Sequence, residues 1–146
     1  MPVNSYYKLP LALSTITAGK DVPTTDLGGS ISKNIELIIM TRFGEHRSDP
    51  TFGCEIWDLD FELIVSQGYW ERQMCKSIQN SIVQHESRLS NIEVTIVLSD
   101  IEKANAIYKH PEIRKKVDIK LKATLKKTGE NFNFTAGIFL SPLSLD

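Results

Sequence analysis

The stretch VDIKLKATLKKTGENFNFTAGIFL, which runs from Val117 to Leu140, decides the fold. Apolar and polar side chains alternate along its first part, and the alternation resumes after a short polar segment. A period of two places the apolar side chains on one face of a β-strand and the polar ones on the other. Residues 127–131 predict a hairpin loop in which Gly129 is free to take positive φ. The stretch therefore predicts two antiparallel strands, over residues 117–125 and 132–140.

An earlier segment alternates in the same way, and its buried face consists of Ile92, Val94, Ile96 and Leu98. On the opposite face of the middle strand, Lys120, Lys122 and Lys126 form the hydrated side of a sheet that is buried on one face only. No aromatic side chains interleave with these lysines, as binding to single-stranded nucleic acid requires. The C-terminal half therefore predicts a three-stranded antiparallel meander.

Helical patterns precede the meander. Three groups of apolar residues recur three or four positions apart: Ile31, Ile35 and Ile38; Ile56, Leu59 and Leu63; Trp70, Met74, Ile78 and Ile82. Ser30 or Ser32 can cap the first helix and Gly44 ends it. The second helix is expected over about residues 55–65, and the third is expected to end near Arg88. The predicted fold class is α+β, with three N-terminal helices packed on a C-terminal three-stranded antiparallel meander in two layers.

Residues 1–29 contain prolines and glycines and sustain no helical or strand period. They predict an N-terminal arm that lies on a domain of residues 30–146, pinned by Tyr6, Tyr7 and residues 9–13. The formal net charge of −1 provides no field that attracts nucleic acid or an anionic membrane. The two cysteines, Cys54 and Cys75, match neither a redox pair nor a zinc site, so we expect reduced thiols in a cytoplasmic protein.

One pair of residues allows an enzymatic alternative. Asp58 and Glu62 lie four positions apart, so on a helix their carboxylates would be ~5 Å apart, as in a retaining glycosidase. Such a pair must straddle a sugar in a cleft, whereas on a helix surface it is ordinarily hydrated. The histidines are scattered and the glycines match no phosphate-binding pattern. We therefore predict no catalytic residue, no metal and no cofactor, and keep the hydrolase as the less favoured alternative.

Two charged segments are the most informative candidates for function. The first, TRFGEHRSDPTFG over residues 41–53, is a loop shaped by glycine and proline, and the second is Glu86-Ser87-Arg88 at the end of the third predicted helix. Exposed ion pairs within such a loop stabilise a protein little. An arginine near a helix C-terminus suits the helix dipole, so Glu86 and Arg88 also fit a plain ion pair. The residues alone leave open whether these charges fasten the fold or contact partners.

Together the two segments resemble the baseplate wedge family of contractile phage tails and type VI secretion systems. The residues that carry the resemblance are Thr41, Arg42, Gly44, Glu45 and Arg47 in the loop, Pro50, Phe52 and Gly53 after it, Phe61 and Glu62, and Glu86 with Arg88. Ser87 stands where the family has proline. Proline there would fix φ, so serine leaves the junction softer.

The resemblance implies a non-enzymatic structural subunit of a bacterial baseplate wedge, TssE-like, in a family that has carried a lysozyme-like label. Its implied partners are larger wedge proteins, TssF- and TssG-like, and contractile sheath subunits, the first ring of which docks by sharing β-strands. Expected partner contacts are Glu86, Arg88, Arg42, Glu45 and Arg47; expected loop-shaping residues are Gly44, Pro50, Phe52 and Gly53; the expected sheath-docking edge carries Phe132, Phe134 and Ile138. Neither nucleic acid nor membrane insertion is expected. A phage or phage-like particle is the alternative setting.

Overall fold

The computed structural model describes residues 5–58, 66–103 and 112–140. In chain order its elements are β1 (Tyr6–Tyr7), α1 (Leu13–Thr17), β2 (Thr24–Thr25), α2 (Leu27–Met40), the 3-10 turn η1 (Glu55–Asp58), α3 (Gln67–His85), β3 (Leu89–Lys103), β4 (Glu112–Leu125) and β5 (Asn131–Leu140). None of the helices in these ranges is long and apolar enough to cross a bilayer.

The three long strands form the predicted meander. They are antiparallel in the order β3-β4-β5, with β4 in the centre. Gly129 takes a φ of 73° in the hairpin, which confirms the expected turn chemistry. The strands are longer than predicted, since β3 continues to Lys103 and β4 begins at Glu112. Residues 104–111 lie outside the description.

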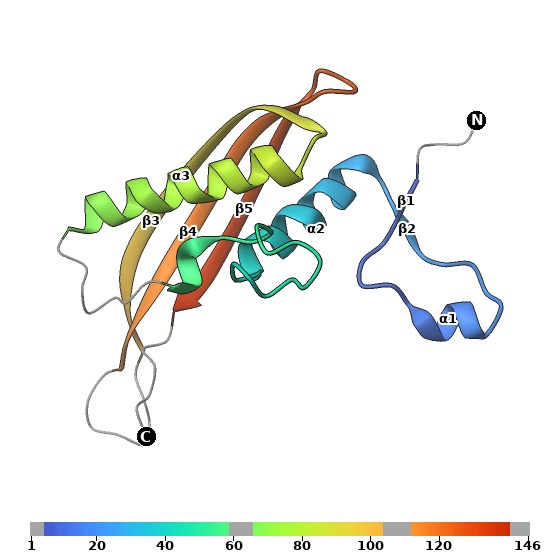
Figure 1. Cartoon of the computed structure of the whole chain (residues 1–146), viewed down its shortest axis with the longest axis horizontal. Helices are drawn as coiled ribbons and strands as arrows, with labels where there is room; N and C mark the ends of the chain where they lie inside the picture. Colours follow the sequence, from blue (N-terminus) through green and yellow to red (C-terminus); the bar gives the residue numbers. More distant parts are fainter. Residues whose placement is uncertain (1–4, 59–65, 104–111, 141–146) are drawn as a thin grey trace.

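Helices α2 and α3 cover one face of this sheet (Figure 1). Their apolar stripes and the inward residues of the strands form one buried cluster, as the periodicity predicts. Members from the helices include Ile35, Ile38, Met74 and Ile78, and members from the sheet include Ile96, Ile119 and Leu121. Lys120 and Lys122 are exposed on the opposite face. The α+β class with two layers is therefore confirmed.

The helical layer differs from the prediction at its second helix. Of the second helix expected over residues 55–65, the structure describes only Glu55–Asp58, which is a single 3-10 turn; residues 59–65, including Phe61 and Glu62, lie outside the description. The backbone before this turn is tied back to the end of α2, because the Cys54 N–H donates to the Thr41 carbonyl at 3.0 Å. Ile56 in this turn is buried against the core.

The start of α2 is also different. Asp26, not Ser30 or Ser32, caps the helix, and its carboxylate accepts a hydrogen bond from the Gly29 N–H at 2.9 Å. The helix ends at Met40, with Thr41 as its C-cap, four residues before Gly44.

The N-terminal arm contains structure that its composition does not predict. Strands β1 and β2 pair antiparallel, and α1 lies between them in a lobe that projects from the start of α2 (Figure 1). Tyr6 contacts the domain as expected, with the guanidinium of Arg88 5.4 Å from its ring centre. The expectation that residues 9–13 pin the arm is wrong, because Leu9, Leu11 and Leu13 are exposed.

Candidate interaction site

Glu86 lies in the short connection between α3 and β3, and its side chain is 1% exposed. Arg88 grips its carboxylate with two parallel bonds: Nε donates to Oε1 at 2.8 Å and Nη2 donates to Oε2 at 2.8 Å. The Arg88 backbone N–H also donates to Oε1, at 3.1 Å. Paired donors in this fork geometry make the strongest class of protein ion pair. The Glu86 carboxylate therefore ties together the connection between α3 and β3 by binding both the backbone and the side chain of Arg88.

Helix α2 completes this network. The Asn34 side-chain amide donates to Glu86 Oε2 at 2.8 Å and to the His85 carbonyl at 3.2 Å, so it reaches the last residue of α3 as well. Ser30 accepts a bond from Arg88 Nη1 at 2.8 Å. We call Ser30, Asn34, Glu86 and Arg88 the junction network. It joins α2 to the point where the chain passes from helix to sheet.

The network sets the charge of its members. Burial alone raises the pKa of Glu86, but the hydrogen bonds from Arg88 and Asn34 outweigh burial and the net pKa is below its usual value. The same bonds to Glu86 raise the pKa of Arg88. Both groups are therefore charged at neutral pH.

The polar loop, residues 41–53, is shaped by its own backbone. The Gly44 N–H donates to the Pro50 carbonyl at 2.9 Å, and the Glu45 carboxylate accepts from the Arg42 N–H at 2.9 Å. At the end of the loop Gly53 has a φ of 120°, and a Cβ there would lie 2.4 Å from the Thr41 carbonyl oxygen. Only glycine fits this approach of two backbone segments.

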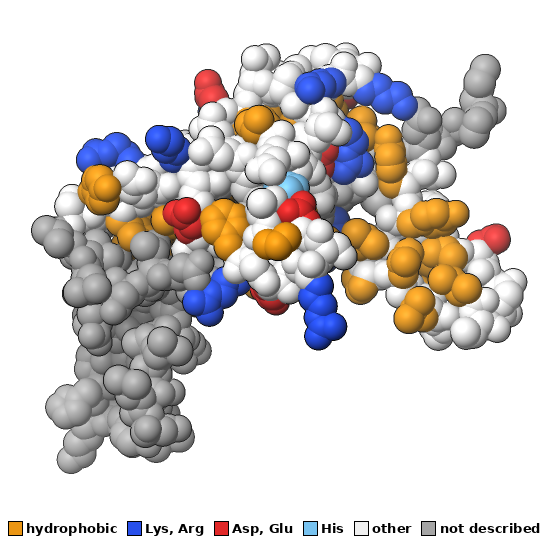
Figure 2. Space-filling model, viewed as in Figure 1, with side chains coloured by type: hydrophobic (Ala, Val, Ile, Leu, Met, Phe, Trp, Pro, Cys, Tyr) orange, Lys and Arg blue, Asp and Glu red, His pale blue; other side chains and the backbone are white. Residues whose placement is uncertain are grey.

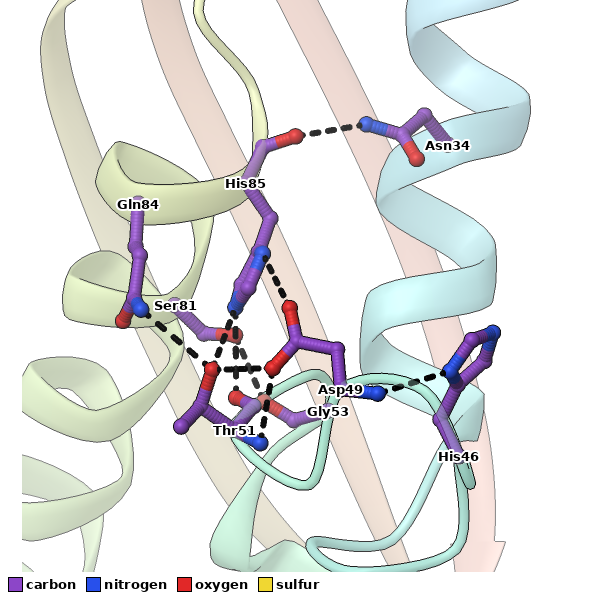
Figure 3. Close-up of polar contacts among 8 residues, drawn as sticks. All are labelled: Asn34, His46, Asp49, Thr51, Gly53, Ser81, Gln84 and His85. Atoms are coloured by element: carbon purple, nitrogen blue, oxygen red, sulfur yellow. Dashed lines mark hydrogen bonds and ion pairs between the residues drawn. The ribbon is translucent and has the colours of Figure 1, made fainter.

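Side chains from the last turns of α3 hold the loop (Figure 3). Ser81 Oγ donates to the Gly53 carbonyl at 2.6 Å, and His85 Nε2 lies 3.2 Å from the Thr51 carbonyl oxygen. His85 Nδ1 is 3.7 Å from an Asp49 carboxylate oxygen. The Thr51 hydroxyl, at 2.6 Å, is the main cause of the lowered pKa of Asp49.

Phe52 adds ring contacts to the hydrogen bonds between the loop and α3. Its ring centre lies 5.1 Å from that of His85 in an edge-on arrangement and 5.8 Å from that of His46. These contacts therefore fix one side of the loop, its inner side, on α3. Arg42, Glu45 and Arg47 remain exposed on the outer side.

The predicted partner-binding residues thus occupy two different environments. Glu86 is buried within the chain, and Arg88 has 30% of its side chain exposed. The charged side chains of the loop, Arg42, Glu45 and Arg47, are exposed. Sequence reasoning missed the contributions of Ser30, Asn34 and His85. Ser30 and Asn34 belong to the polar side of a helix, where the sequence carries no sign that they bind across to α3.

The two edges of the sheet are also unlike. At β3 the Leu98 N–H donates to Glu71 Oε1 at 2.9 Å, and its carbonyl accepts from Gln67 Nε2 at 2.8 Å, so side chains of α3 bind the outward backbone groups of this residue. Because Leu98 directs its backbone groups away from β4, the antiparallel register directs those of Thr135 and Gly137 away from the sheet at the other edge. No described strand pairs with this side of β5. Phe132 and Ile138, predicted for the docking edge, point into the core.

The described residues contain no group of three or more His, Cys, Asp or Glu side chains that could hold a metal ion. Of the carboxylate pair considered for hydrolysis, Asp58 is the last residue of η1 and Glu62 lies outside the description.

The family model described as "Baseplate wedge protein gp25" matches residues 25–130, which include the polar loop, the junction network and most of the sheet. The chain belongs to the baseplate wedge family. Wedge proteins of this family are structural parts of a baseplate, and the resemblance inferred from the loop and junction residues is confirmed.

Two solved structures are similar to this wedge-family chain. One is a Geobacter sulfurreducens protein named as a candidate tail lysozyme, 18% identical, with a TM-score of 0.60 over 85% of this chain and 100% of that one. The other is a chain in the baseplate complex from the type VI secretion system, 14% identical, with a TM-score of 0.52 over 77% of this chain and 93% of that one. At these identities the similarity establishes the fold alone. No curated protein matches the chain.

Proposed function

We propose that this chain is a non-enzymatic, TssE-like subunit of a type VI secretion baseplate wedge. It binds larger TssF- and TssG-like wedge proteins through the exposed charges of the polar loop and through Arg88. It docks the first sheath ring by accepting a β-strand at β5. Membership in the wedge family is the observation that carries this proposal.

The difference between the sheet edges supports strand docking at β5. A strand joins a sheet by pairing with unused backbone N–H and C=O groups along an edge. At β3 side chains of α3 already bind such groups, whereas at β5 the groups of Thr135 and Gly137 face outward. The groups that pair with an added strand are therefore the backbone N–H and C=O groups of alternate residues in β5. The apolar side chains between them hold β5 on the helices.

The polar loop supports contact with the wedge partners. Its inner side is fixed on α3 by Ser81 and His85, so the outer side presents Arg42, Glu45 and Arg47 from a stable backbone. Arginine makes directional, bidentate bonds to carboxylates, which suits a fixed partner. Glu86 acts indirectly, by holding Arg88.

Two alternatives remain distinct from this proposal. A phage or phage-like particle is the alternative setting for the same wedge fold. The lysozyme-like alternative requires Asp58 and Glu62 to act on a sugar, and a peptidoglycan hydrolysis assay with the purified chain tests it. We expect no hydrolysis above that of an Asp58→Asn variant.

A proline at the open edge tests the docking mechanism. Thr135→Pro removes an outward N–H, which an edge strand tolerates, but it blocks the bond that an added strand needs. We expect the variant to fold and to co-purify with the TssF- and TssG-like proteins of its own genome, while sheath assembly on the baseplate is lost. Thr135→Ala is the matched control and should support normal sheath assembly. Normal sheath assembly with Thr135→Pro would show that β5 is not the docking strand.

A further inference from the structure

The N-terminal arm exposes a cluster of apolar side chains that neither the core nor the proposed sites use. Tyr7, Leu9, Leu11, Leu13 and Ile16 are 67%, 39%, 46%, 68% and 48% exposed. We call residues 9–19 the apolar lobe. Figure 2 shows apolar side chains gathered on this projecting part of the molecule. Single exposed apolar residues are ordinary on protein surfaces, but a contiguous group of this kind typically marks an interaction site.

The lobe is ordered although it has no core of its own. No residue of α1 is buried. Its backbone closes on itself instead: the Lys20 N–H donates to the Thr15 carbonyl at 2.9 Å and the Ala18 N–H donates to the Ser14 carbonyl at 3.1 Å. At the base of the arm the Lys8 N–H donates to the Pro23 carbonyl at 2.9 Å. A surface that is already shaped loses less conformational entropy when it binds.

The chemistry of the lobe indicates what covers it. No charged residue occurs between Lys8 and Lys20, so the complementary surface is apolar and uncharged. The lobe projects outward, so its partner surface is hollow (Figure 1). The lobe is also continuous with the junction network, because Tyr6 at its base lies against Arg88. A partner that contacts Arg88 therefore lies beside the lobe.

The lobe lies before residue 25, where the family match begins. We propose that the apolar lobe inserts into an uncharged apolar hollow on one of the larger baseplate proteins and anchors this chain beside Arg88. This inference rests on the proposed function. It adds a second, apolar contact to the charged contacts of the loop.

A pair of substitutions on α1 tests the inference. The double variant Leu13→Ser and Ile16→Ser removes two exposed apolar side chains and should leave the unfolding temperature unchanged. The matched control is Val83→Ser on α3, which is 61% exposed and lies outside the lobe. The probe is the set of TssF- and TssG-like proteins of the same genome, co-expressed with the full chain. Since burial of two such side chains stabilises a complex appreciably, we expect the double variant to bind about tenfold or more weakly, and the control to bind as wild type.

The outcomes separate the inference from the proposed function. If the wild-type chain fails to bind the wedge proteins, the proposed function is wrong. If wild type and double variant bind equally, the function stands and the lobe inference is overturned. The inference is equally overturned if size-exclusion chromatography shows that the lobe joins two copies of this chain, with dimers in wild type and monomers in the double variant. Binding of the lobe to phosphatidylglycerol vesicles in place of the wedge proteins would overturn it too.

Discussion

The junction network and the polar loop both carry the charged residues of the wedge family, yet their surroundings are opposite. At the junction the Glu86 carboxylate is buried, and every hydrogen bond that it accepts comes from a fixed donor in α2 or beside it in the chain. In the loop the arginine side chains are exposed, and backbone hydrogen bonds such as that from Gly44 to Pro50 shape the chain. A buried ion pair that loses one member leaves a charge without compensation, whereas an exposed charge is screened. The comparison suggests that the buried Glu86 stabilises the domain, whereas the loop charges and the exposed part of Arg88 are available to partners.

Removing one member of the buried pair should have the largest effect. Arg88→Ala leaves the Glu86 carboxylate buried without its cation, and we expect the free energy of unfolding to fall by about 3 kcal/mol. Arg47→Ala, in the exposed loop, should change it by less than about 0.5 kcal/mol. Urea denaturation of both variants measures the difference. Equal stability of the two would mean that the junction is no more important to the fold than the loop.

The loop should be sensitive to substitution of its glycines, and unequally so. Gly53→Ala brings a Cβ against the Thr41 carbonyl oxygen in addition to the cost of positive φ, so we expect a loss of about 3 kcal/mol. Gly44, with a φ of 82°, has open space around the added Cβ, and Gly44→Ala should cost only about 1 kcal/mol. Thermal unfolding of the pair checks this order. The reverse order would show that the loop is not anchored at Gly53.

The two regions should also differ in their response to acid. Because the pKa of folded Glu86 is lowered, its contribution to stability is present above the pKa of the unfolded chain and is lost as pH falls through the folded value. The wild-type chain should therefore lose stability below about pH 4.5 more steeply than Glu86→Gln. Denaturation curves at a series of pH values from about 6 to 3 measure the slopes. Parallel slopes would show that Glu86 titrates no differently in the folded and unfolded chains.

Ser87→Pro should have the smallest effect, and in the opposite direction. Glu86, with φ −126° and ψ 88°, lies outside the helical region that a following proline disfavours. A proline in a compatible backbone reduces the entropy of the unfolded chain, so we expect a gain of about 0.5 kcal/mol. The control Ser87→Ala should be neutral in the same denaturation assay. A loss of stability with proline alone would mean that the junction network needs the freedom that serine provides.

The meander could be predicted because alternation along residues 117–140 is a local signal that also specifies the buried face. The long helices were predictable for the same reason, since Ile35 and Met74 belong to stripes of helical period. The turn at Glu55–Asp58 was not, because its apolar spacing is that of an α-helix and does not distinguish a 3-10 turn from one. The structure of the arm depends on the pairing of β1 with β2, which no periodic pattern in the sequence predicts.

The candidate site was predictable in part. The sequence identifies the charged residues of the loop and junction, but burial is a property of the folded chain. Nothing in the sequence distinguishes Glu86 from Glu45. Only the folded structure, in which Asn34 of α2 binds the Glu86 carboxylate, shows that Glu86 is the buried one. The unlike edges of the sheet depend on Gln67 and Glu71 reaching Leu98, which is likewise a tertiary contact.

The most direct test measures folding and wedge binding together in two variants, Arg88→Lys and a loop variant with Arg42 and Arg47 both changed to Ala. Each is assayed by urea denaturation and by co-purification with the TssF- and TssG-like proteins. We predict that the loop variant folds with nearly wild-type stability and loses most of its binding. We predict that Arg88→Lys, which keeps the charge but loses the fork, is less stable than the loop variant. Undiminished binding by the loop variant would contradict the assignment of the loop to the partner interface.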